Sequence, residues 1–399
     1  MKSFAIVLVC YNRLHGLRRL LKSLEFADFD NRNDIHLVFS IDYSGTNEVR
    51  TFAEEYNWNH GIKHIRAFES RQGLKKHILS CGDYTEQFDI VVVLEDDVYL
   101  SDSFYRYAYS AAEFYENDDH IAGISLYSFQ KNWLDWPLRF EPQRYGDYDA
   151  FFLKVAQSWG QVWTKEKWLP FKEWLSENSD FTIDNEDVPS YLLTWPESSW
   201  LKYHDKYLIK TNKYFVYPYV SFSTNFSDAG EHSQFITADH QVELLFGKRE
   251  FLFPHFENDC IRYDQYMDRE GLEKWLEVED GSVSIDFWGT KPPTKQRYLL
   301  SLESRPYKII KSYQLSLRPI ELSVIQNVNG QGIYLYDTAV RASKPSINGK
   351  FNRYNYSIRT RESRKILSFA FRLRGFDLRV RIKEKVKKVF RKLFSHRRH

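Results

Sequence analysis

The segment Ile90-Val91-Val92-Val93-Leu94-Glu95-Asp96-Asp97 joins an apolar run to three adjacent carboxylates, and the expected architecture follows from it. A run of five valine, isoleucine and leucine residues is typical of a strand that is buried on both faces of a parallel sheet. Three neighbouring carboxylates repel one another unless a cation lies among them. Because hard oxygen ligands suit Mn²⁺ or Mg²⁺, the segment predicts a strand that ends at a metal site.

Carboxylates also gather ahead of helices, which is the competing interpretation. Ser101 and Asp102 precede Phe104 and look like a capping region. The metal site is favoured because ligands of open α/β sheets bind beyond the carboxyl ends of parallel strands.

Repeated strand and helix patterns occupy the first hundred residues. Apolar runs at 4–9 and 35–41 and a short one at 64–66 predict strands, and leucines at helical spacing over 14–24 predict an amphipathic helix. A second helix-like stretch follows Asp42. Such β-α units favour a right-handed, doubly wound sheet.

The order of these features resembles the GT-A glycosyltransferases, the nucleotide-sugar fold of family 2 and of eukaryotic N-acetylglucosaminyltransferase I. The features are a strand followed by Asn12-Arg13, a strand followed by Asp42, the basic segment 71–77, and Leu94-Glu95-Asp96-Asp97. The metal motif of N-acetylglucosaminyltransferase I is likewise Glu-Asp-Asp after a valine-rich strand. Further matches lie at 124–128, expected as a strand, and at 151–152, 158–160, 223–226 and 230–233.

The resemblance covers roughly residues 3–260 and implies the fold class and the domains. We expect an α/β, GT-A (Rossmann-like) and mostly parallel central sheet flanked by helices, with a C-terminal accessory region and a basic amphipathic helix. The glycosyltransferase domain would span 1–260, with a nucleotide-sugar half at 1–125 and an acceptor half at 126–260. The accessory region would span 261–358 and the basic tail 359–399.

The resemblance also implies which residues meet the donor. Arg13 would approach the nucleotide, and Asp42 would accept hydrogen bonds from the uracil or ribose of a UDP-sugar. Arg71 and Lys75 would meet the pyrophosphate, which attracts cations strongly. For these last two, the alternative is a solvated basic face on a surface helix.

The carboxylate triplet would serve the departing diphosphate. The resemblance implies that Asp97 binds the metal directly, with Asp96 and Glu95 orienting the metal and the donor. A divalent cation, Mn²⁺ or Mg²⁺, neutralises the negative charge that builds on the diphosphate as the anomeric bond breaks.

An inverting transferase also needs a base that takes the proton from the acceptor hydroxyl. Related inverting enzymes place a carboxylate in a tryptophan-rich segment, and Glu197 in Trp195-Pro196-Glu197-Ser198-Ser199-Trp200 is the candidate here. The alternatives are a helix-capping role for Glu197, or a shifted register that moves the base to Asp205 or to the acidic residues Asp184, Glu186 and Asp187. Trp195, Trp200 and Tyr203 would either stack on sugars or pack in the core.

His232 and Ser233 lie in a polar, glycine-containing loop where the family has a segment that orders over the bound donor. His232 would ligate the metal or touch a phosphate, and Ser233 would donate to a phosphate; closure of such a loop excludes water. The alternative is a solvated loop. Asn225 begins a formal glycosylation triplet, which only a secreted protein would use.

Composition indicates where the protein works. Three scattered cysteines show neither a metal-ligand spacing nor a disulfide framework, which favours a reducing compartment. The first strand begins directly after Met1-Lys2-Ser3, which leaves no room for a signal peptide, and no segment approaches the roughly 18 apolar residues of a membrane span. A Golgi enzyme would need such an anchor. These features favour a bacterial, cytoplasmic protein.

The C-terminal tail is strongly basic. Residues 359–399 contain 16 lysines and arginines and three acids, and the apolar residues between 382 and 393 fall on one helical face. A basic amphipathic helix is typical of an in-plane membrane binder attracted to anionic lipid, so we expect a peripheral location at the inner membrane. A docked or solvated helix and nucleic acid are the alternatives, and we expect no nucleic-acid partner because the sequence shows no module for one.

These observations predict a metal-dependent glycosyltransferase. It would move a sugar from a UDP-linked donor, with UDP-N-acetylglucosamine as one candidate, to a hydroxyl of a surface-polysaccharide or lipid-linked oligosaccharide acceptor. We expect an inverting single displacement with Glu197 as the base. The alternatives are a sugar nucleotidyltransferase, which would show a glycine-rich loop where this chain has Tyr11-Asn12-Arg13-Leu14-His15-Gly16, and a non-catalytic glycan-binding or membrane-binding protein with a decayed site.

Overall fold

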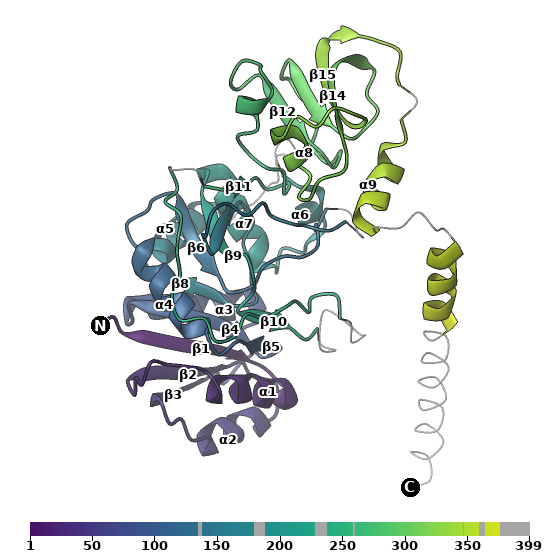
Figure 1. Ribbon diagram of the computed structural model, residues 1–399. Helices are drawn as coiled ribbons and strands as arrows, with labels where there is room; N and C mark the ends of the chain where they lie inside the picture. Colours follow the sequence, from purple (N-terminus) through teal and green to yellow (C-terminus); the bar gives the residue numbers. More distant parts are fainter. Residues whose placement is uncertain are drawn as a thin grey trace.

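The computed structural model describes residues 1–134, 138–178, 188–227, 238–257, 260–345, 347–358 and 364–375. Within these residues the strands form a large sheet, a two-stranded pair and a C-terminal sheet (Figure 1). The large sheet contains, in spatial order, β11 (Arg262–Tyr263), β7 (Ala150–Leu153), β9 (Tyr214–Pro218), β6 (Ile121–Ser125), β8 (Gln161–Trp163), β4 (Ile90–Glu95), β1 (Phe4–Cys10), β2 (Ile35–Ile41) and β3 (Gly61–Ala67).

Most neighbours in the large sheet are parallel. Parallel pairing joins β3 to β2, β2 to β1, β1 to β4, β6 to β9 and β7 to β11. Strand β8 runs antiparallel to β4 and β6, and β7 runs antiparallel to β9. The expectation of a mostly parallel α/β sheet is confirmed.

One strand differs in position from the sequence prediction. The strand expected at 124–128 is β6, which begins at Ile121 and ends at Ser125. The Ser125 hydroxyl donates to the carbonyl of Tyr127 at 2.7 Å and accepts from the Tyr127 amide at 3.1 Å. This local turn takes the chain out of the sheet, and such side-chain hydrogen bonds compete with strand pairing.

Helices cover both faces of the large sheet. One face packs on α1 (Leu14–Glu25), α2 (Glu48–Glu55) and α4 (Phe104–Phe114), and the other packs on α3 (Leu74–Gly82), α5 (Lys165–Glu177) and α7 (Trp200–Thr211). Alternate residues of β1 enter the two layers, with Ile6 and Leu8 on the first side and Val7 and Val9 on the second. Two-sided burial explains why β1 and β4 are apolar at nearly every position.

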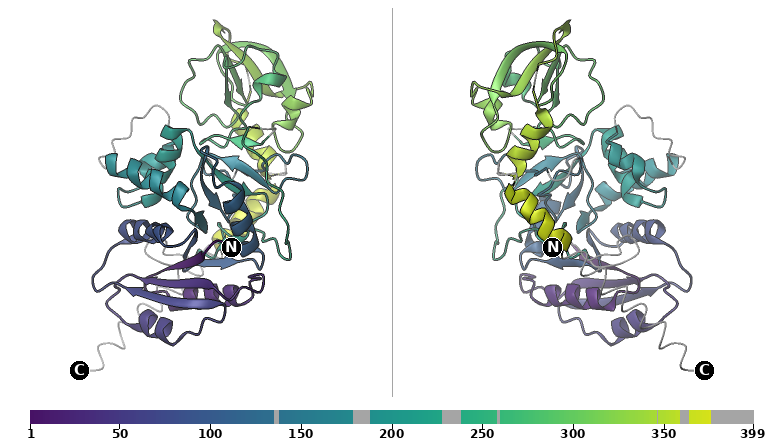
Figure 2. Two further views of the ribbon diagram at one scale, coloured as in Figure 1. Left: turned by 90° about the vertical axis from the view of Figure 1, so that its left-hand side faces the viewer. Right: turned by 90° about the vertical axis from the view of Figure 1, so that its right-hand side faces the viewer.

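The C-terminal sheet has its own core. Its described strands, in spatial order, are β12 (Val283–Asp286), β13 (Tyr298–Ser301), β15 (Gly332–Arg341) and β14 (Tyr307–Gln314). They pack with η2 (Glu273–Trp275), α8 (Leu322–Ile325) and α9 (Gly349–Ile358) around Phe287, Leu300 and Ile333. Figures 1 and 2 show this sheet at the opposite end of the molecule from β2 and β3. The remaining described elements of the N-terminal part are η1 (Asp83–Glu86), α6 (Ser190–Thr194) and the two-stranded pair of β5 (Val98–Leu100) and β10 (Ser223–Asn225).

Truncation of a central strand should destabilise the fold. Leu8 is fully buried and lies beside Phe39 and Leu94 in the two neighbouring strands. We expect Leu8→Ala to cost about 2–5 kcal/mol and to lower the urea concentration at the unfolding midpoint. Leu252, which is 52% exposed, provides the control: Leu252→Ala should change stability by less than about 0.5 kcal/mol. Equal midpoints for the two variants would contradict this packing.

Candidate functional site

Three neighbouring strands deliver polar residues to one edge of the large sheet. Cys10 lies beside Ile41 and Val9 lies beside Glu95, so β1, β2 and β4 end at the same edge. The loops that follow carry Arg13, Asp42 and the pair Asp96 and Asp97. Because the strands are parallel, residues far apart in the sequence meet here.

Arg13 bridges the two aspartates. Its Nη2 forms an ion pair with Asp96 Oδ1, and its Nη1 donates to Asp97 Oδ2 at 3.0 Å. Asp96 is 3% exposed and Asp97 8%. Two nearly buried carboxylates would be costly without a cation, and the guanidinium supplies positive charge to both.

Asn225 holds the other oxygen of Asp97. Strand β5 (Val98–Leu100) pairs antiparallel with β10 (Ser223–Asn225), which places Asn225 opposite Val98. The Asn225 Nδ2 donates to Asp97 Oδ1 at 2.9 Å, and the backbone amide of Phe226 donates to the Asp97 carbonyl at 3.0 Å. The sequence interpretation noted Asn225 only as a formal glycosylation triplet and missed this role, because a pairing across more than 120 residues leaves no local signal.

The capping interpretation of the acidic triplet is wrong. Glu95 is the last residue of β4, Asp96 and Asp97 form the turn between β4 and β5, and β5 separates all three from α4. Residues Ser101 and Asp102 do lie at that helix, where the Ser101 hydroxyl accepts from the Ser103 amide at 3.1 Å.

The electrostatics of the turn reflect crowding of like charges. Burial raises the pKa of Glu95, and the charge of Asp97 raises it further, while Arg13 acts in the opposite direction. For Arg13, burial opposes the charged form, but the charges of Asp96 and Asp97 outweigh burial and raise its pKa. A cation near this turn is therefore stabilised.

The donor chemistry of the turn fits a hard divalent cation. Among the described residues, no cluster of three or more histidine, cysteine, aspartate and glutamate side chains is placed to hold a metal ion. Mg²⁺-type sites commonly use one or two carboxylates together with substrate phosphates, rather than a cage made of protein alone. Asp96 and Asp97 meet that requirement, and their oxygens suit Mn²⁺ equally well.

Asp42 joins the end of β2 to the start of α3. Its Oδ1 accepts from the Gln72 amide at 2.7 Å and from the Tyr43 amide at 2.9 Å, and its Oδ2 accepts from the Gly73 amide at 3.0 Å. Gly73 has a φ of +76°, which favours glycine. Since a carboxylate has about four lone-pair directions, these bonds leave little capacity for a ligand.

Arg71 and Lys75 lie at the start of α3. The Arg71 guanidinium lies 5.3 Å from the ring centre of Tyr11, which follows β1. The Lys75 ammonium lies 3.5 Å from the ring centre of Tyr203 on α7, and burial lowers its pKa. These contacts connect the β1 edge to the segment that contains Glu197.

Glu197 is exposed but paired. Its side chain is 70% exposed, and it accepts from Lys202 Nζ at 2.9 Å and from the Tyr203 hydroxyl at 2.9 Å. The hydrogen bond from Lys202 lowers the pKa of Glu197. Glu197 does not cap α7, because Ser199 occupies that position and makes no side-chain capping bond. In this conformation Glu197 is accessible but weakly basic.

Of the alternatives to Glu197 as the base, only Asp205 lies within the described residues, and it is buried. Asp205 is 1% exposed and accepts from the Ala156 amide at 2.6 Å, so no acceptor hydroxyl reaches it in this structure. Trp200 and Tyr203 are 4% and 3% exposed, so core packing rather than sugar stacking describes them. Asp184, Glu186, Asp187, His232 and Ser233 lie outside the described residues, as does the helix expected at 382–393.

An aromatic group near Asp97 was not foreseen. His240 stacks on Trp133 with ring centres 5.6 Å apart and lies 4.5 Å from the ring centre of Trp159. Burial lowers the pKa of His240, and the charges of Asp239 and, to a smaller extent, Asp97 act against that effect. Trp133 is 36% exposed, so part of this aromatic group is open to solvent. The order of residues in the sequence does not reveal this aromatic group, because tertiary packing brings its members together.

A comparison with protein families matches residues 5–168 to the model described as Glycosyl transferase family 2. No curated protein matches the chain. The matched segment contains β1 to β8, apart from Phe4, and the carboxylate turn.

Several solved structures match part of this chain at low identity. TarS 1–349 of S. aureus, in complex with UDP-GlcNAc, is 15% identical with a TM-score of 0.37, and the match covers 58% of this chain and 60% of that one. The mannosyltransferase PcManGT of Pyrobaculum calidifontis, in complex with GDP-Man and Mn²⁺, is 14% identical with a TM-score of 0.31, covering 55% and 58%. GalNAc-T7 with UDP, GalNAc and Mn²⁺ is 11% identical with a TM-score of 0.37, covering 55% and 43%. The matches thus cover 60% or less of the length of each of these proteins.

Replacement of Asp205 should change how stability depends on pH. Burial raises the pKa of Asp205 from its ordinary value of 3.8 to about 8. Between about pH 4 and pH 8 the folded protein holds a proton that the unfolded chain releases, so the free energy of unfolding falls as pH rises, by at most ~1.4 kcal/mol per pH unit.

Asp205→Asn keeps the shape and removes this titration. We therefore expect its stability relative to the wild type to increase between pH 5 and pH 7.5, measured by urea unfolding at both values. A difference that stays constant with pH would contradict the buried, proton-bound state of Asp205.

Proposed function

We propose that this protein transfers a sugar from a nucleotide-sugar donor, because residues 5–168 match the model described as Glycosyl transferase family 2. The donor would be UDP-linked, with UDP-N-acetylglucosamine as one candidate, and the acceptor would be a hydroxyl of a surface polysaccharide or lipid-linked oligosaccharide. The observation that carries the proposal is the Asp96 and Asp97 pair at the carboxyl end of β4, oriented by Arg13 and Asn225.

Each of these residues has a role in the proposed site. Asp97 and Asp96 would hold Mn²⁺ or Mg²⁺, which neutralises charge on the departing diphosphate when bound. Asn225 fixes the direction of the Asp97 carboxylate through the bond at 2.9 Å. Arg13, which balances both carboxylates, would also pair with a phosphate oxygen, since a guanidinium binds carboxylates and phosphates in the same geometry.

Further residues would complete the donor and acceptor sides. Arg71 and Lys75 would face the pyrophosphate from the start of α3. Glu95 would help to orient the metal and the donor from beside Asp96 and Asp97. The open face of Trp133 beside Trp159 and His240 would stack an acceptor sugar, because aromatic faces suit apolar faces of sugar rings. Glu197 would act as the base in an inverting single displacement, once its pair with Lys202 opens.

The metal role is tested with Asp97→Ala. We expect Mn²⁺-dependent release of UDP from UDP-N-acetylglucosamine by the wild type, and a loss of at least about 100-fold in the variant, because a bound cation contributes several kcal/mol to charge stabilisation. Calorimetric titration with Mn²⁺ gives a second measurement, in which the variant should bind more weakly.

The exposed residue Asp280 provides the matched control, and Asp280→Ala should retain activity. If the wild type releases no nucleotide from any UDP-linked or GDP-linked donor, with or without Mn²⁺, the non-catalytic alternative is favoured.

The base is tested with two variants. Glu197→Gln should reduce transfer about 10²–10⁴-fold, the usual contribution of a general base. Lys202→Met removes the partner that lowers the pKa of Glu197, so the acidic limb of the pH profile of kcat/KM should move to higher pH. If the acidic limb does not move and Glu197→Gln remains fully active, the base is another residue.

The C-terminal segment carries the proposed membrane contact. No helix among the described residues has the length and apolar character needed to cross a bilayer. The helix at residues 364–375 contains four basic and no acidic residues, and Figure 1 shows it apart from the two sheets. Its apolar side chains are exposed: Ile366 37%, Leu367 57%, Phe369 62%, Phe371 68% and Leu373 54%. We propose that this helix lies in an anionic membrane surface, on the cytoplasmic side of a bacterial inner membrane.

Vesicle sedimentation tests the membrane contact. The wild type should pellet with phosphatidylglycerol vesicles and more weakly with phosphatidylcholine vesicles, because basic residues are attracted to anionic lipid. Joint replacement Phe369→Ser and Phe371→Ser should release most of the protein, whereas Phe246→Ser, at a position that is 55% exposed elsewhere on the surface, should not. Equal binding by all three proteins would contradict the role of this helix.

A further inference from the structure

Helix α9 has one buried face and one exposed apolar face. Its buried residues are Gly349, Arg353 and Ser357. Phe351 and Ile358, which lie seven positions apart, are 54% and 41% exposed. With about 3.6 residues per turn, these two side chains point in nearly the same direction, roughly opposite to the buried ones. The helix therefore holds two large apolar side chains in solvent on the side that faces away from the C-terminal sheet.

The exposed face belongs to a basic stretch of the chain. Residues 338–358 contain four basic residues and neither aspartate nor glutamate. Three of the four, Arg341, Lys344 and Lys350, are exposed. Val340, at the end of β15, is 43% exposed and adds a further apolar side chain. This stretch thus offers positive charge together with apolar side chains.

The contacts of α9 connect it rigidly to the large sheet. The Tyr356 hydroxyl donates to the Leu317 carbonyl at 2.7 Å. The neighbouring Arg318 donates through Nη1 to Glu141 of the N-terminal part at 2.8 Å. Leu138, also of the N-terminal part, enters the core of the C-terminal sheet. A partner bound to α9 would therefore be fixed in position relative to the large sheet.

Charge selects among the possible partners of this face. In a two-fold dimer, a second copy would bring the same basic stretch against itself, and like charges across an interface are unfavourable. The residues beyond 375 are also strongly basic, so the tail of the chain would be repelled in the same way. An anionic lipid surface attracts basic residues and accepts large apolar side chains.

The position of α9 agrees with a lipid partner. In Figure 1, α9 and the helix at 364–375 follow one another along one flank of the molecule, and the right-hand view of Figure 2 looks onto that flank. The helix at 364–375 is the one for which a membrane contact is proposed above, and both helices combine exposed apolar and basic residues.

We infer that the exposed face of α9 is a second membrane contact, which binds an anionic lipid surface together with the helix at 364–375. The choice of partner rests on the proposed membrane contact, whereas the role of α9 goes beyond it. A single helix at the end of the chain would act as a tether, but a contact through α9 fixes the orientation of the large sheet. The carboxylate turn would then lie at a set distance from the membrane, which favours encounter with a lipid-linked acceptor.

A fluorescent label on the full chain tests the inference. All three cysteines are buried, so Phe351→Cys can be labelled selectively with a thiol-reactive NBD dye, whose emission increases and shifts to the blue in apolar surroundings. We expect this shift on phosphatidylglycerol vesicles, and the same shift for a label at Phe369→Cys. A label at Ile62→Cys should not respond, because Ile62 is 53% exposed on β3, at the opposite end of the molecule from the C-terminal sheet (Figure 1).

Charge reversal of the argument is tested by sedimentation with the same vesicles. Lys344→Gln combined with Lys350→Gln should raise the lipid concentration for half-maximal binding at least about fivefold, because each basic residue near an anionic surface contributes to binding. Lys22→Gln combined with Lys165→Gln removes two exposed lysines of the N-terminal part and provides the matched control, which should bind as the wild type does. Circular dichroism checks that all variants are folded.

The outcomes separate the inference from the proposed membrane contact. If the label at 369 responds and the label at 351 does not, the inference is overturned and the membrane contact stands. If neither responds, both are overturned. A response at 351 that needs protein concentration rather than vesicles would identify a second copy as the partner. Equal responses on phosphatidylcholine, or equal binding by the two lysine variants, would also overturn the inference, since charge would then have no part in it.

Discussion

Asp96 and Asp97 concentrate negative charge at a nearly buried turn, and the neighbouring structure is organised so that this charge is balanced. Arg13 from the loop after β1 pairs with both carboxylates, and Asn225 from β10 donates to the remaining Asp97 oxygen. The cost of desolvating two carboxylates would otherwise exceed what a short turn contributes. The position of three strands and two loops is thereby coupled to a single electrostatic requirement.

The sheet holds these charged side chains in fixed positions, as a reaction centre requires. Strands β1, β2 and β4 are buried on both faces, so their register is determined by packing as well as by hydrogen bonds. A rigid sheet edge can hold polar groups in fixed directions, whereas the loops beyond it are free to adapt to a ligand. Asp42 contributes to this rigidity rather than standing free, since three backbone amides bind its carboxylate.

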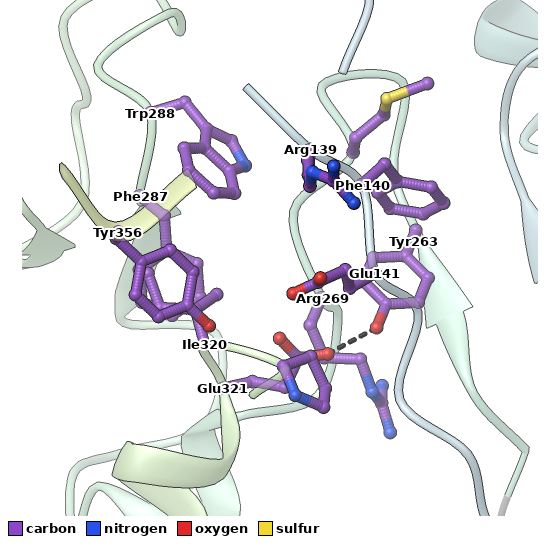
Figure 3. Close-up of a pocket in the computed structure, with 12 residues that line it drawn as sticks. Arg139, Phe140, Glu141, Tyr263, Arg269, Phe287, Trp288, Ile320, Glu321 and Tyr356 are labelled. Carbon is purple, nitrogen blue, oxygen red and sulfur yellow. Dashed lines mark hydrogen bonds between the residues drawn. The ribbon is translucent and has the colours of Figure 1, made fainter. Parts of the chain in front are cut away.

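The C-terminal part adds surfaces that the sheet edge lacks. Its four-stranded sheet has a separate core, and Leu138 of the N-terminal part enters that core. A small cavity lined by residues that include Arg139 and Trp288 lies at this boundary (Figure 3). Beyond α9, the helix at 364–375 exposes large apolar side chains between basic ones, which is unfavourable in water and favourable at a lipid interface. The proposed membrane contact would use this part of the chain.

The amino-acid pattern was sufficient to place β1, β2 and β4, because aliphatic runs buried on two faces leave a strong local signal. It also located the acidic turn and Arg13, which follow directly after such strands. It missed the Asn225 contact with Asp97, the Trp133 and His240 group, and the burial of Asp205. These depend on contacts between segments separated by tens to hundreds of residues, and side-chain environment is set by such contacts. Local composition therefore sufficed for the strands, while packing determined which polar groups meet at the site.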